Sequence, residues 1–422
     1  MTTSMSEPSH ATNGLAIAVT DPTKHNEGVN AYIGYSITTN ADDTREEFQA
    51  PRTTVLRRYS DFHFLHAKLG HAFPGTILPP LPDKALVGRF GASFVEGRRR
   101  ALERYLLRVA KHPELGASRE LVLFLQADEA TLQHAKEEWK RSQRNQPQKV
   151  LKLFKQAFTQ MEQSLSHAPT GHVTVPPSEL DGRVDGIAAR VHLLEVHYHS
   201  VAREASGWIR GEKEAGDGCF QLGLALTLLG QNEAGGLGEA IRSAGHAIDG
   251  VSAVALAAVE DGGVLLEEPL VEWSRAVGAA KVALLRRAEA RKVYLESLVE
   301  VATRLHVKGK WVGMIGKEEK LNAAELAWSK AVEVAEKKKG EYEEVSERLV
   351  RDWGTFREEK AREVHRVLVA FAEAQVTRHE KMRKAWEEAM PKVREGGREG
   401  GREGMNGAGE APPMDIFLAH FG

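Results

Sequence analysis

Residues 57–62 read RRYSDF, and two further basic segments follow this stretch along the chain. Residues 78–84 read LPPLPDK, and residues 94–106 read FVEGRRRALERYL. The guanidinium group of arginine binds phosphate through paired hydrogen bonds, and the lysine ammonium group adds a compact positive charge. Placed at a strand end, in a proline-rich loop and at a helix start, the three segments predict a site for a phosphorylated ligand.

Positive charge is concentrated in this part of the chain. The whole sequence of 422 residues has a formal net charge of −2, which argues against binding nucleic acid through bulk charge. Residues 51–111 contain 12 Lys and Arg against 4 Asp and Glu, whereas residues 1–50 contain 2 against 7. We therefore expect the basic part to face an anionic surface, and we expect no nucleic-acid partner.

The sequence of residues 14–128 predicts an α+β domain. Residues 31–37 alternate apolar and polar as a half-buried strand does, and residues 53–59 are expected to form another strand. Ser60 or Asp61 can cap the helix that follows, and a further helix follows the proline-rich loop. Together these signals indicate a three-stranded antiparallel sheet with helices.

Strand signals disappear after this domain, and residues 177–393 read as long helices. Apolar residues repeat with alternating steps of four and three over residues 180–201, which is a coiled-coil-like pattern. Six glycines in this first helix, each costing up to about 1 kcal/mol relative to alanine, weaken its continuity. Two further helical stretches span residues 239–305 and 321–390, and residues 262–269, with two glycines and a proline, should bend or break the former. Three such helices predict an elongated all-α bundle or a dimer.

Residues 129–176 are expected to link the two parts and to contain an amphipathic helix over residues 149–165. Apolar residues recur in that helix at steps of three and four, and lysines flank the apolar stripe. The stripe can insert into a membrane while the lysines meet lipid headgroups, or it can dock on the helical bundle. The residues predicted to insert are Leu151, Phe154, Phe158 and Met161.

The two ends of the chain are expected to lack packed structure. Residues 1–13 are polar, and residues 394–422 begin with glycine-rich repeats typical of a flexible linker. Cys219 is the single cysteine, so no intrachain disulfide is possible. Because neither a signal peptide nor a stretch of ~20 apolar residues is apparent, we expect a cytoplasmic protein whose membrane contact is peripheral.

The three basic segments, in this order, resemble the phox-homology (PX) domain, which binds phosphoinositides on endosomes. Residues 268–270 and 357–391 resemble parts of a Bin-amphiphysin-Rvs (BAR) domain. Over roughly residues 14–393 the chain resembles the sorting nexins of the PX-BAR type, particularly the retromer-associated sorting nexin 1 group of plants and algae. The resemblance implies a PX domain over residues 14–128, followed over residues 177–393 by a BAR domain that forms a dimeric crescent.

The resemblance also implies a role for each of four residues in binding phosphatidylinositol 3-phosphate. Arg58 would bind the 3-phosphate, and the ring of Tyr59 would pack against the inositol. Lys84 would meet the 1-phosphate, and Arg98 would hold the 4- and 5-hydroxyl groups. The alternative, from the residues alone, is a solvated basic surface without a shared ligand. Arg57, Arg99 and Arg100 are expected to be surface charges or contacts within the fold.

The resemblance to BAR domains implies a dimer with a basic concave face that lies on anionic lipid. We expect a homodimer, or a heterodimer with another PX-BAR sorting nexin, on the cytosolic face of endosomal membranes. Such a dimer would sense curvature, form tubules and support protein sorting and retrograde transport together with the retromer core. The expected basic contacts are Arg304, Lys308 and Lys310, with an ordinary solvated charge as the alternative for each.

Two other classes of function are open alternatives. One is a cytosolic coiled-coil scaffold whose PX-like domain binds protein. The other is a lipid-metabolising enzyme with a PX domain for targeting, but the helical periodicity of residues 130–422 argues against a compact catalytic domain. Residues 313–317 lack the spacing of a phosphate-binding P-loop, and Cys219 has no evident base partner. We therefore expect no enzymatic activity, no cofactor and no metal site.

Overall fold

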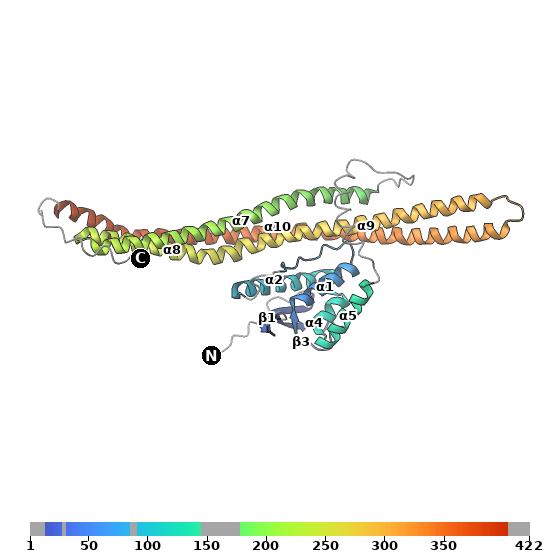
Figure 1. Ribbon diagram of the computed structural model, residues 1–422, viewed down its shortest axis with the longest axis horizontal. Helices are drawn as coiled ribbons and strands as arrows, with labels where there is room; N and C mark the ends of the chain where they lie inside the picture. Colours follow the sequence, from blue (N-terminus) through green and yellow to red (C-terminus); the bar gives the residue numbers. More distant parts are fainter. Residues whose placement is uncertain (1–12, 28–30, 85–90, 145–177, 404–422) are drawn as a thin grey trace. The chain divides into compact units, whose positions relative to one another are not determined.

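The computed structural model describes residues 13–27, 31–84, 91–144 and 178–403. The chain divides into two compact units. The first unit contains Met1–Tyr198 together with Glu272–Lys360, and the second contains His199–Val271 together with Ala361–Gly422. Figure 1 labels the helices and strands along the chain, and each unit is described separately below.

A three-stranded antiparallel sheet begins the first unit, as the sequence predicts. Its strands, paired in chain order, are β1 (Leu15–His25), β2 (Tyr32–Ala41) and β3 (Arg52–Arg58). The register of β1 against β2 shifts between Thr20 and Thr23. Within this bulge Asp21 takes a positive φ of 47°, and Pro22 has no N–H to donate to the ladder.

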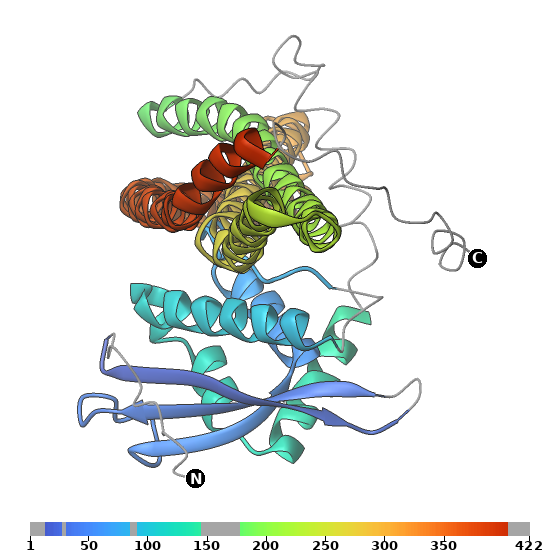
Figure 2. The same ribbon diagram turned by 90° about the vertical axis from the view of Figure 1, so that its left-hand side faces the viewer.

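Helices complete the α+β domain. In the described residues they are α1 (Tyr59–Ala72), α2 (Ala92–Lys111), α3 (Pro113–Gly116), α4 (Arg119–Gln126) and α5 (Glu129–Arg144). Figure 2 shows α2 lying along one face of the three strands. In the core between them, the ring of Phe62 meets Tyr105 and Phe124 edge-on, at centroid distances of 6.4 and 5.0 Å. The predicted fold class is confirmed.

Helix α1 begins earlier than the predicted caps allow. Its N-cap is Arg58, and Tyr59 is already helical, so the strand ends one residue earlier than predicted and neither Ser60 nor Asp61 is the cap. Asp61 instead stands at the third helical position, where its carboxylate accepts the N–H of Arg58 at 2.9 Å. The side chain reaches back from inside the helix, as the second residue of a capping box does.

Helix α5 packs on this domain, although the sequence predicts a linker from residue 129 onward. Leu132 is fully buried, and Lys136 forms a buried ion pair with Asp61 of α1 at 2.5 Å. The ring of Trp139 meets that of His71 edge-on at 5.2 Å. The helix is mostly polar, so its few packing residues leave little periodic signal in the sequence.

Long helices form the remainder of the described chain. They are α7 (Glu179–Asn232), α8 (Gly235–Gly262), the π-helical segment η2 (Gly263–Glu267), α9 (Glu268–Trp311) and α10 (Glu318–Glu403). The sequence predicts a bend or a break within residues 262–269, and of these two the break is wrong, because η2 joins α8 to α9 without a gap. Glu268 donates its N–H to the carbonyl of Gly263, five residues back, and Pro269, which lacks an N–H, follows it. None of the described helices has the length and hydrophobicity that crossing a bilayer requires.

Helix α7 continues through its glycines, and several of them lie where α8 comes closest. In the second unit, a methyl group on Gly223 would lie 2.9 Å from the carbonyl oxygen of Gly245, and one on Gly245 would lie 2.8 Å from that of Gly223. Ser252 donates to the carbonyl of Gly216 at 2.8 Å. Small residues thus face each other every seventh position and allow close backbone approach. They are Gly216, Gly223 and Gly230 on α7, with Gly238, Gly245 and Ser252 on α8.

Helix α10 continues to Glu403, so residues 394–403 are helical where the sequence predicts the start of a flexible tail. The rest of the predicted tail lies outside the described residues.

Ion pairs join α2 to α9 within the first unit. Glu272 of α9 accepts hydrogen bonds from Nε of Arg104, at 2.6 Å, and from Arg108. Asp352 of α10 accepts the N–H of Ile77, which precedes the proline-rich loop, at 3.1 Å. These contacts hold α9 beside the helix, and α10 beside the start of the loop, that carry the predicted site.

Candidate functional site

Arg58 lies at the carboxyl end of β3, where the chain turns into α1. Its guanidinium group stacks on the ring of Tyr32, 5.2 Å from the centroid, and its side chain is 40% exposed. Nε of Arg58 lies 3.8 Å from Asp61 and, although buried, has no hydrogen-bond partner among the described residues. Because Lys136 already pairs with Asp61 at 2.5 Å, Arg58 retains hydrogen-bonding capacity for another anion.

Tyr59, the first residue of α1, faces the proline-rich loop. Its hydroxyl group donates a hydrogen bond to the carbonyl oxygen of Pro82 at 2.6 Å. Burial raises the pKa of the Tyr59 phenol, so the hydroxyl remains protonated and continues to donate. The ring therefore anchors the loop and places an aromatic surface next to Arg58 in the chain.

Arg98 of α2 is held by two rings and one carbonyl group. Its guanidinium carbon lies 4.7 Å from the centroid of Tyr59 and 4.4 Å from that of Phe94. Nη2 of Arg98 donates to the carbonyl oxygen of Asp83 at 2.7 Å. Lys84 follows Asp83 directly, and its side chain is exposed. The structure thus brings Tyr59, Arg98 and the loop that carries Lys84 together.

Helix α9 contributes a further cation, Arg275, which sequence reasoning missed. Nη2 of Arg275 forms an ion pair with the carboxylate of Asp83 at 2.5 Å, while Arg98 holds the carbonyl group of the same residue. The loop is therefore fixed from two sides. Nothing in the sequence marks Arg275, because it stands 192 residues from Asp83 in a stretch that reads only as a helix.

Neighbouring arginines are occupied within the fold, as expected. Arg57 is buried and donates through Nε to the carbonyl oxygen of Phe124 at 2.9 Å. Arg99 pairs with Glu96 at 2.8 Å and with Glu103 at 3.2 Å. These arginines stabilise the domain, and the guanidinium group of Arg57 also lies over the ring of Phe124, 5.5 Å from the centroid.

The residues predicted to contact lipid from the helical part lie near the carboxyl end of α9. Arg304 pairs with Glu300 at 2.6 Å, and Lys308 pairs with Glu325 at 2.8 Å. Lys310 is exposed. The three cations share one end of the helix, and their role on lipid stays a prediction.

One predicted element falls outside the described residues: the amphipathic helix over residues 149–165, whose apolar side chains are Leu151, Phe154, Phe158 and Met161. For metal ions, the described part of the chain can be examined. There, no group of three His, Cys, Asp or Glu side chains is placed to hold an ion.

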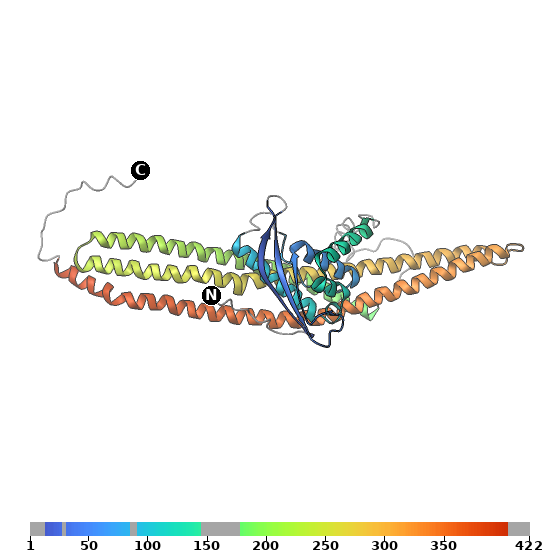
Figure 3. The same cartoon turned by 90° about the horizontal axis from the view of Figure 1, so that it is seen from below.

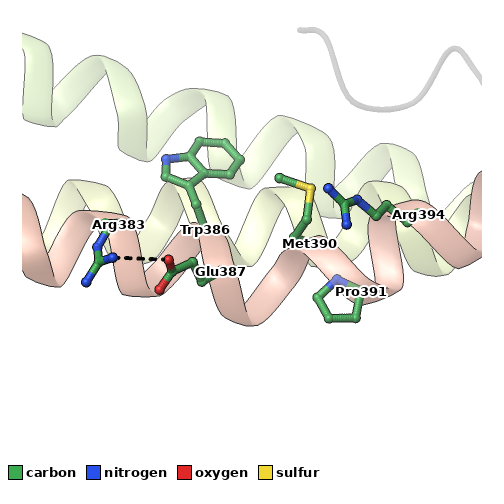
Figure 4. Close-up of a pocket in the computed structure, with 6 residues that line it drawn as sticks. All are labelled: Arg383, Trp386, Glu387, Met390, Pro391 and Arg394. Carbon is green, nitrogen blue, oxygen red and sulfur yellow. Dashed lines mark ion pairs between the residues drawn. The ribbon is translucent and has the colours of Figure 1, made fainter.

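A shallow hollow of about 600 Å³ runs along α10 in the second unit (Figure 4). It is lined by Arg383, Trp386, Glu387, Met390, Pro391 and Arg394. Arg383 pairs with Glu387 at 3.4 Å, and both Trp386 and Met390 are exposed. Because successive turns of one helix supply the lining, these six residues form no converging set of cations and no acid–base pair suited to catalysis.

Comparison with known proteins finds a family match for the sheet-containing domain and another for the long helices. The model for the PX domain matches residues 45–128, and the model for Vps5 C terminal like matches residues 252–392. Sorting nexin 1 of Arabidopsis thaliana is 30% identical over 381 residues, which cover 90% of this chain and 92% of that protein. Sorting nexin-1 of Homo sapiens is 23% identical over 398 residues, 90% of this chain and 72% of that protein.

Among solved structures, the cryo-EM structure of the SNX-BAR Mvp1 tetramer is similar, with a TM-score of 0.52 and 16% sequence identity. The similarity covers 89% of this chain and 99% of that chain. At this level of identity it concerns the fold, and it agrees with the order of a sheet-containing domain followed by long helices.

Proposed function

This chain belongs to the sorting nexin family and combines a PX domain with a BAR-like helical domain, and from that premise we propose that it binds phosphatidylinositol 3-phosphate in membranes. Sorting nexins of this class are membrane-binding adaptors and not enzymes. One observation carries the proposal. Arg58 presents a half-exposed guanidinium group that lies over the ring of Tyr32, and its Nε has no hydrogen-bond partner among the described residues.

In this proposal Arg58 binds the 3-phosphate. Stacking on Tyr32 restricts the plane of its guanidinium group, so that the edge with paired N–H donors can meet two phosphate oxygens. Asp61 does not compete strongly for Arg58, because its charge is offset by Lys136. Tyr59, beside Arg58, supplies the ring for the face of the inositol.

The other two cations stand on α2 and at the end of the proline-rich loop. Arg98, held against Tyr59 and Phe94, contacts the 4- and 5-hydroxyl groups. Lys84, exposed at the end of the loop, meets the 1-phosphate as a point charge. Arg275 does not touch the lipid in this scheme but positions the loop through Asp83.

The helical part is proposed to form a dimer, either with a second copy or with another PX-BAR sorting nexin. Contiguous exposed apolar surface is typical of a face that another chain covers. In the second unit, α7 leaves large apolar side chains exposed at steps of four residues, namely Phe220, Leu224 and Leu228. Two linked PX domains would multiply modest headgroup affinities without new contacts.

Membership of the family supports the further proposal that the dimer works on endosomal membranes. There it would sense curvature, form tubules and sort proteins together with the retromer core. Arg304, Lys308 and Lys310 would add attraction to anionic lipid, each on the order of 1 kcal/mol near the surface.

The test compares two arginines of the same strand. Arg58→Ala should abolish flotation with vesicles that contain phosphatidylinositol 3-phosphate. Arg52→Ala removes the same charge from the exposed other end of β3 and should leave flotation intact. Light scattering should show the same dimer for both variants. If Arg58→Ala floats as well as the unmodified chain, the site assignment is wrong, and if the unmodified chain dimerises without floating, a cytosolic scaffold is favoured.

A further inference from the structure

Residues 312–317, which join α9 to α10, expose three apolar side chains, and we call them the apolar turn. Ile315 is 99% exposed, Val312 60% and Met314 52%. Single exposed apolar residues are common on proteins, but turns draw chiefly on Gly, Pro, Asn, Asp and Ser. Three apolar side chains within six residues indicate a surface that is covered when the protein works.

Two glycines give the apolar turn its shape. The N–H of Met314 donates to the carbonyl oxygen of Trp311 at 3.3 Å, and the same bond recurs three residues later. Gly313 and Gly316 are the third residues of these two successive turns, with positive φ values of 78° and 76°. Residues that carry a side chain rarely adopt such φ values at the third position of a turn. Ile315, the second residue of the second turn, therefore stands at its outer corner.

The apolar turn is carried on two paired helices. Figures 1 and 3 show α9 and α10 side by side up to the turn, with no other labelled element of the first unit beside it. Lys308 of α9 pairs with Glu325 of α10 at 2.8 Å and lies over the ring of Trp328 at 4.5 Å. These contacts hold the ends of the helices together, so little order has to be gained when the turn meets a surface.

Basic side chains surround the apolar turn. Residues 304–320 contain five Lys and Arg against two Asp and Glu, and no acidic residue stands between Lys308 and Lys317. Lys310 and Lys317, on either side of the turn, are exposed. An apolar tip inside a ring of positive charge matches the layers of an anionic bilayer, in which phosphates lie outside the acyl chains.

We propose that the apolar turn inserts into the outer layer of an anionic membrane, with Ile315 at the acyl chains and Lys310 and Lys317 at lipid phosphates. The inference rests on the proposed membrane function and deepens it, because it adds an anchor that recognises no particular headgroup. A second copy of this chain is disfavoured as the occupant, since contact between two such turns would bring lysines against lysines.

The first test places an environment-sensitive fluorophore at the apex. Ile315→Cys, combined with Cys219→Ser, is labelled with bimane and mixed with vesicles of phosphatidylcholine and phosphatidylserine that carry brominated acyl chains. Bound protein should show a blue-shifted and quenched signal. The matched control is the same label at Val334→Cys, which is 52% exposed on α10 of the same unit and should be neither shifted nor quenched.

The second test removes the apolar side chain without adding charge. Ile315→Gln should weaken binding to phosphatidylserine vesicles about tenfold, because a buried isoleucine contributes at least that factor. Ile315→Trp should retain binding, and Val334→Gln should leave it unchanged. Unaltered helical circular dichroism checks that the exposed turn can be changed without unfolding.

The outcomes separate this inference from the proposed function. If the protein binds vesicles containing phosphatidylinositol 3-phosphate but the label is not quenched, the inference is overturned and the headgroup site stands. Quenching on phosphatidylserine vesicles without the phosphoinositide supports insertion even if Arg58→Ala has no effect. Disulfide cross-linking of two copies through the Ile315→Cys variant, without quenching, would instead identify a contact between turns. Absence of binding to either vesicle overturns both proposals.

Discussion

The site around Arg58 and the apolar turn both present positive charge, but they hold it in opposite ways. At the site, Arg58 and Arg98 lie against the rings of Tyr32 and Tyr59. At the apolar turn, exposed lysines flank an almost fully exposed Ile315. Fixed guanidinium directions suit one phosphorylated headgroup, whereas exposed ammonium groups around an apolar tip suit any anionic bilayer. Selectivity and anchoring are therefore assigned to different parts of the chain.

The largest effect should follow from breaking the buried ion pair beneath the site. Lys136→Met leaves the carboxylate of Asp61 buried without its cation, which should lower the free energy of unfolding by about 3–5 kcal/mol. Arg58 would also be drawn toward Asp61 and away from a phosphate. Urea unfolding measures the loss, and Lys140→Met, on the exposed side of the same helix, is the control. Equal midpoints for both variants would show that the pair does not support the site.

Acidification should also affect the site around Arg58 and the apolar turn differently. Burial lowers the pKa of His66 to about 4, and its Nδ1 has no partner among the described residues. Between pH 6.5 and 4 the unfolded chain therefore binds more protons than the folded chain, so stability falls as the pH drops through this window. The loss should be on the order of 3 kcal/mol.

The measurement is urea unfolding at several pH values from 7 to 4. His66→Phe, which keeps a ring beside Tyr105, should flatten the curve. Binding to phosphatidylinositol 3-phosphate should weaken on acidification before binding to phosphatidylserine does. Parallel stability curves for the variant and the unmodified chain would remove His66 as the cause.

A smaller effect should show whether the site recognises the directed N–H donors of Arg58 or only its positive charge. Arg58→Lys keeps the positive charge but loses the paired donors and the planar group that stacks on Tyr32. We expect binding to vesicles with phosphatidylinositol 3-phosphate to weaken about tenfold, the equivalent of one lost charge-assisted hydrogen bond. Lys310→Arg at the apolar turn should change binding little. If Arg58→Lys binds normally, the site recognises charge alone and the contrast with the turn fails.

The smallest effect should come from Arg275, which acts through the loop. Its pair with Asp83 is partly exposed, so Arg275→Ala should weaken headgroup binding by no more than about fivefold. Exchanging the two charges, in Arg275→Asp with Asp83→Arg, should restore part of the loss. A vesicle titration checks both variants. Full binding by Arg275→Ala would mean that Arg98 alone positions the loop.

Sequence patterns predict much of the fold because burial leaves a periodic signal. The alternation of β2 and the apolar repeats of the long helices are visible in the residues themselves. What could not be predicted is how the backbone accommodates a residue that usually ends or weakens a helix. Pro269 reads as a helix breaker, yet η2 supplies a wider turn just before it. Gly216 reads as a weak point of α7, yet Ser252 of α8 donates to its carbonyl group there.

The residues of the candidate site also divide into those that the sequence predicts and those that it does not. Arg58, Tyr59 and Arg98 belong to compact motifs, and the structure places Tyr59 and Arg98 in contact. Arg275 and Tyr32 meet the site only through tertiary packing and strand pairing, so no local pattern announces them. The residues of the apolar turn can be read from the sequence, but only the exposed fraction of Ile315 shows that they do not form a buried loop.

The most direct measurement of the central claim is calorimetric titration with a soluble, short-chain phosphatidylinositol 3-phosphate, which removes the membrane and the apolar turn from the experiment. The account predicts saturable binding by the unmodified chain, none by Arg58→Ala, and none of unphosphorylated phosphatidylinositol by either. Equal heats for the two lipids, or unchanged binding by Arg58→Ala, would contradict it.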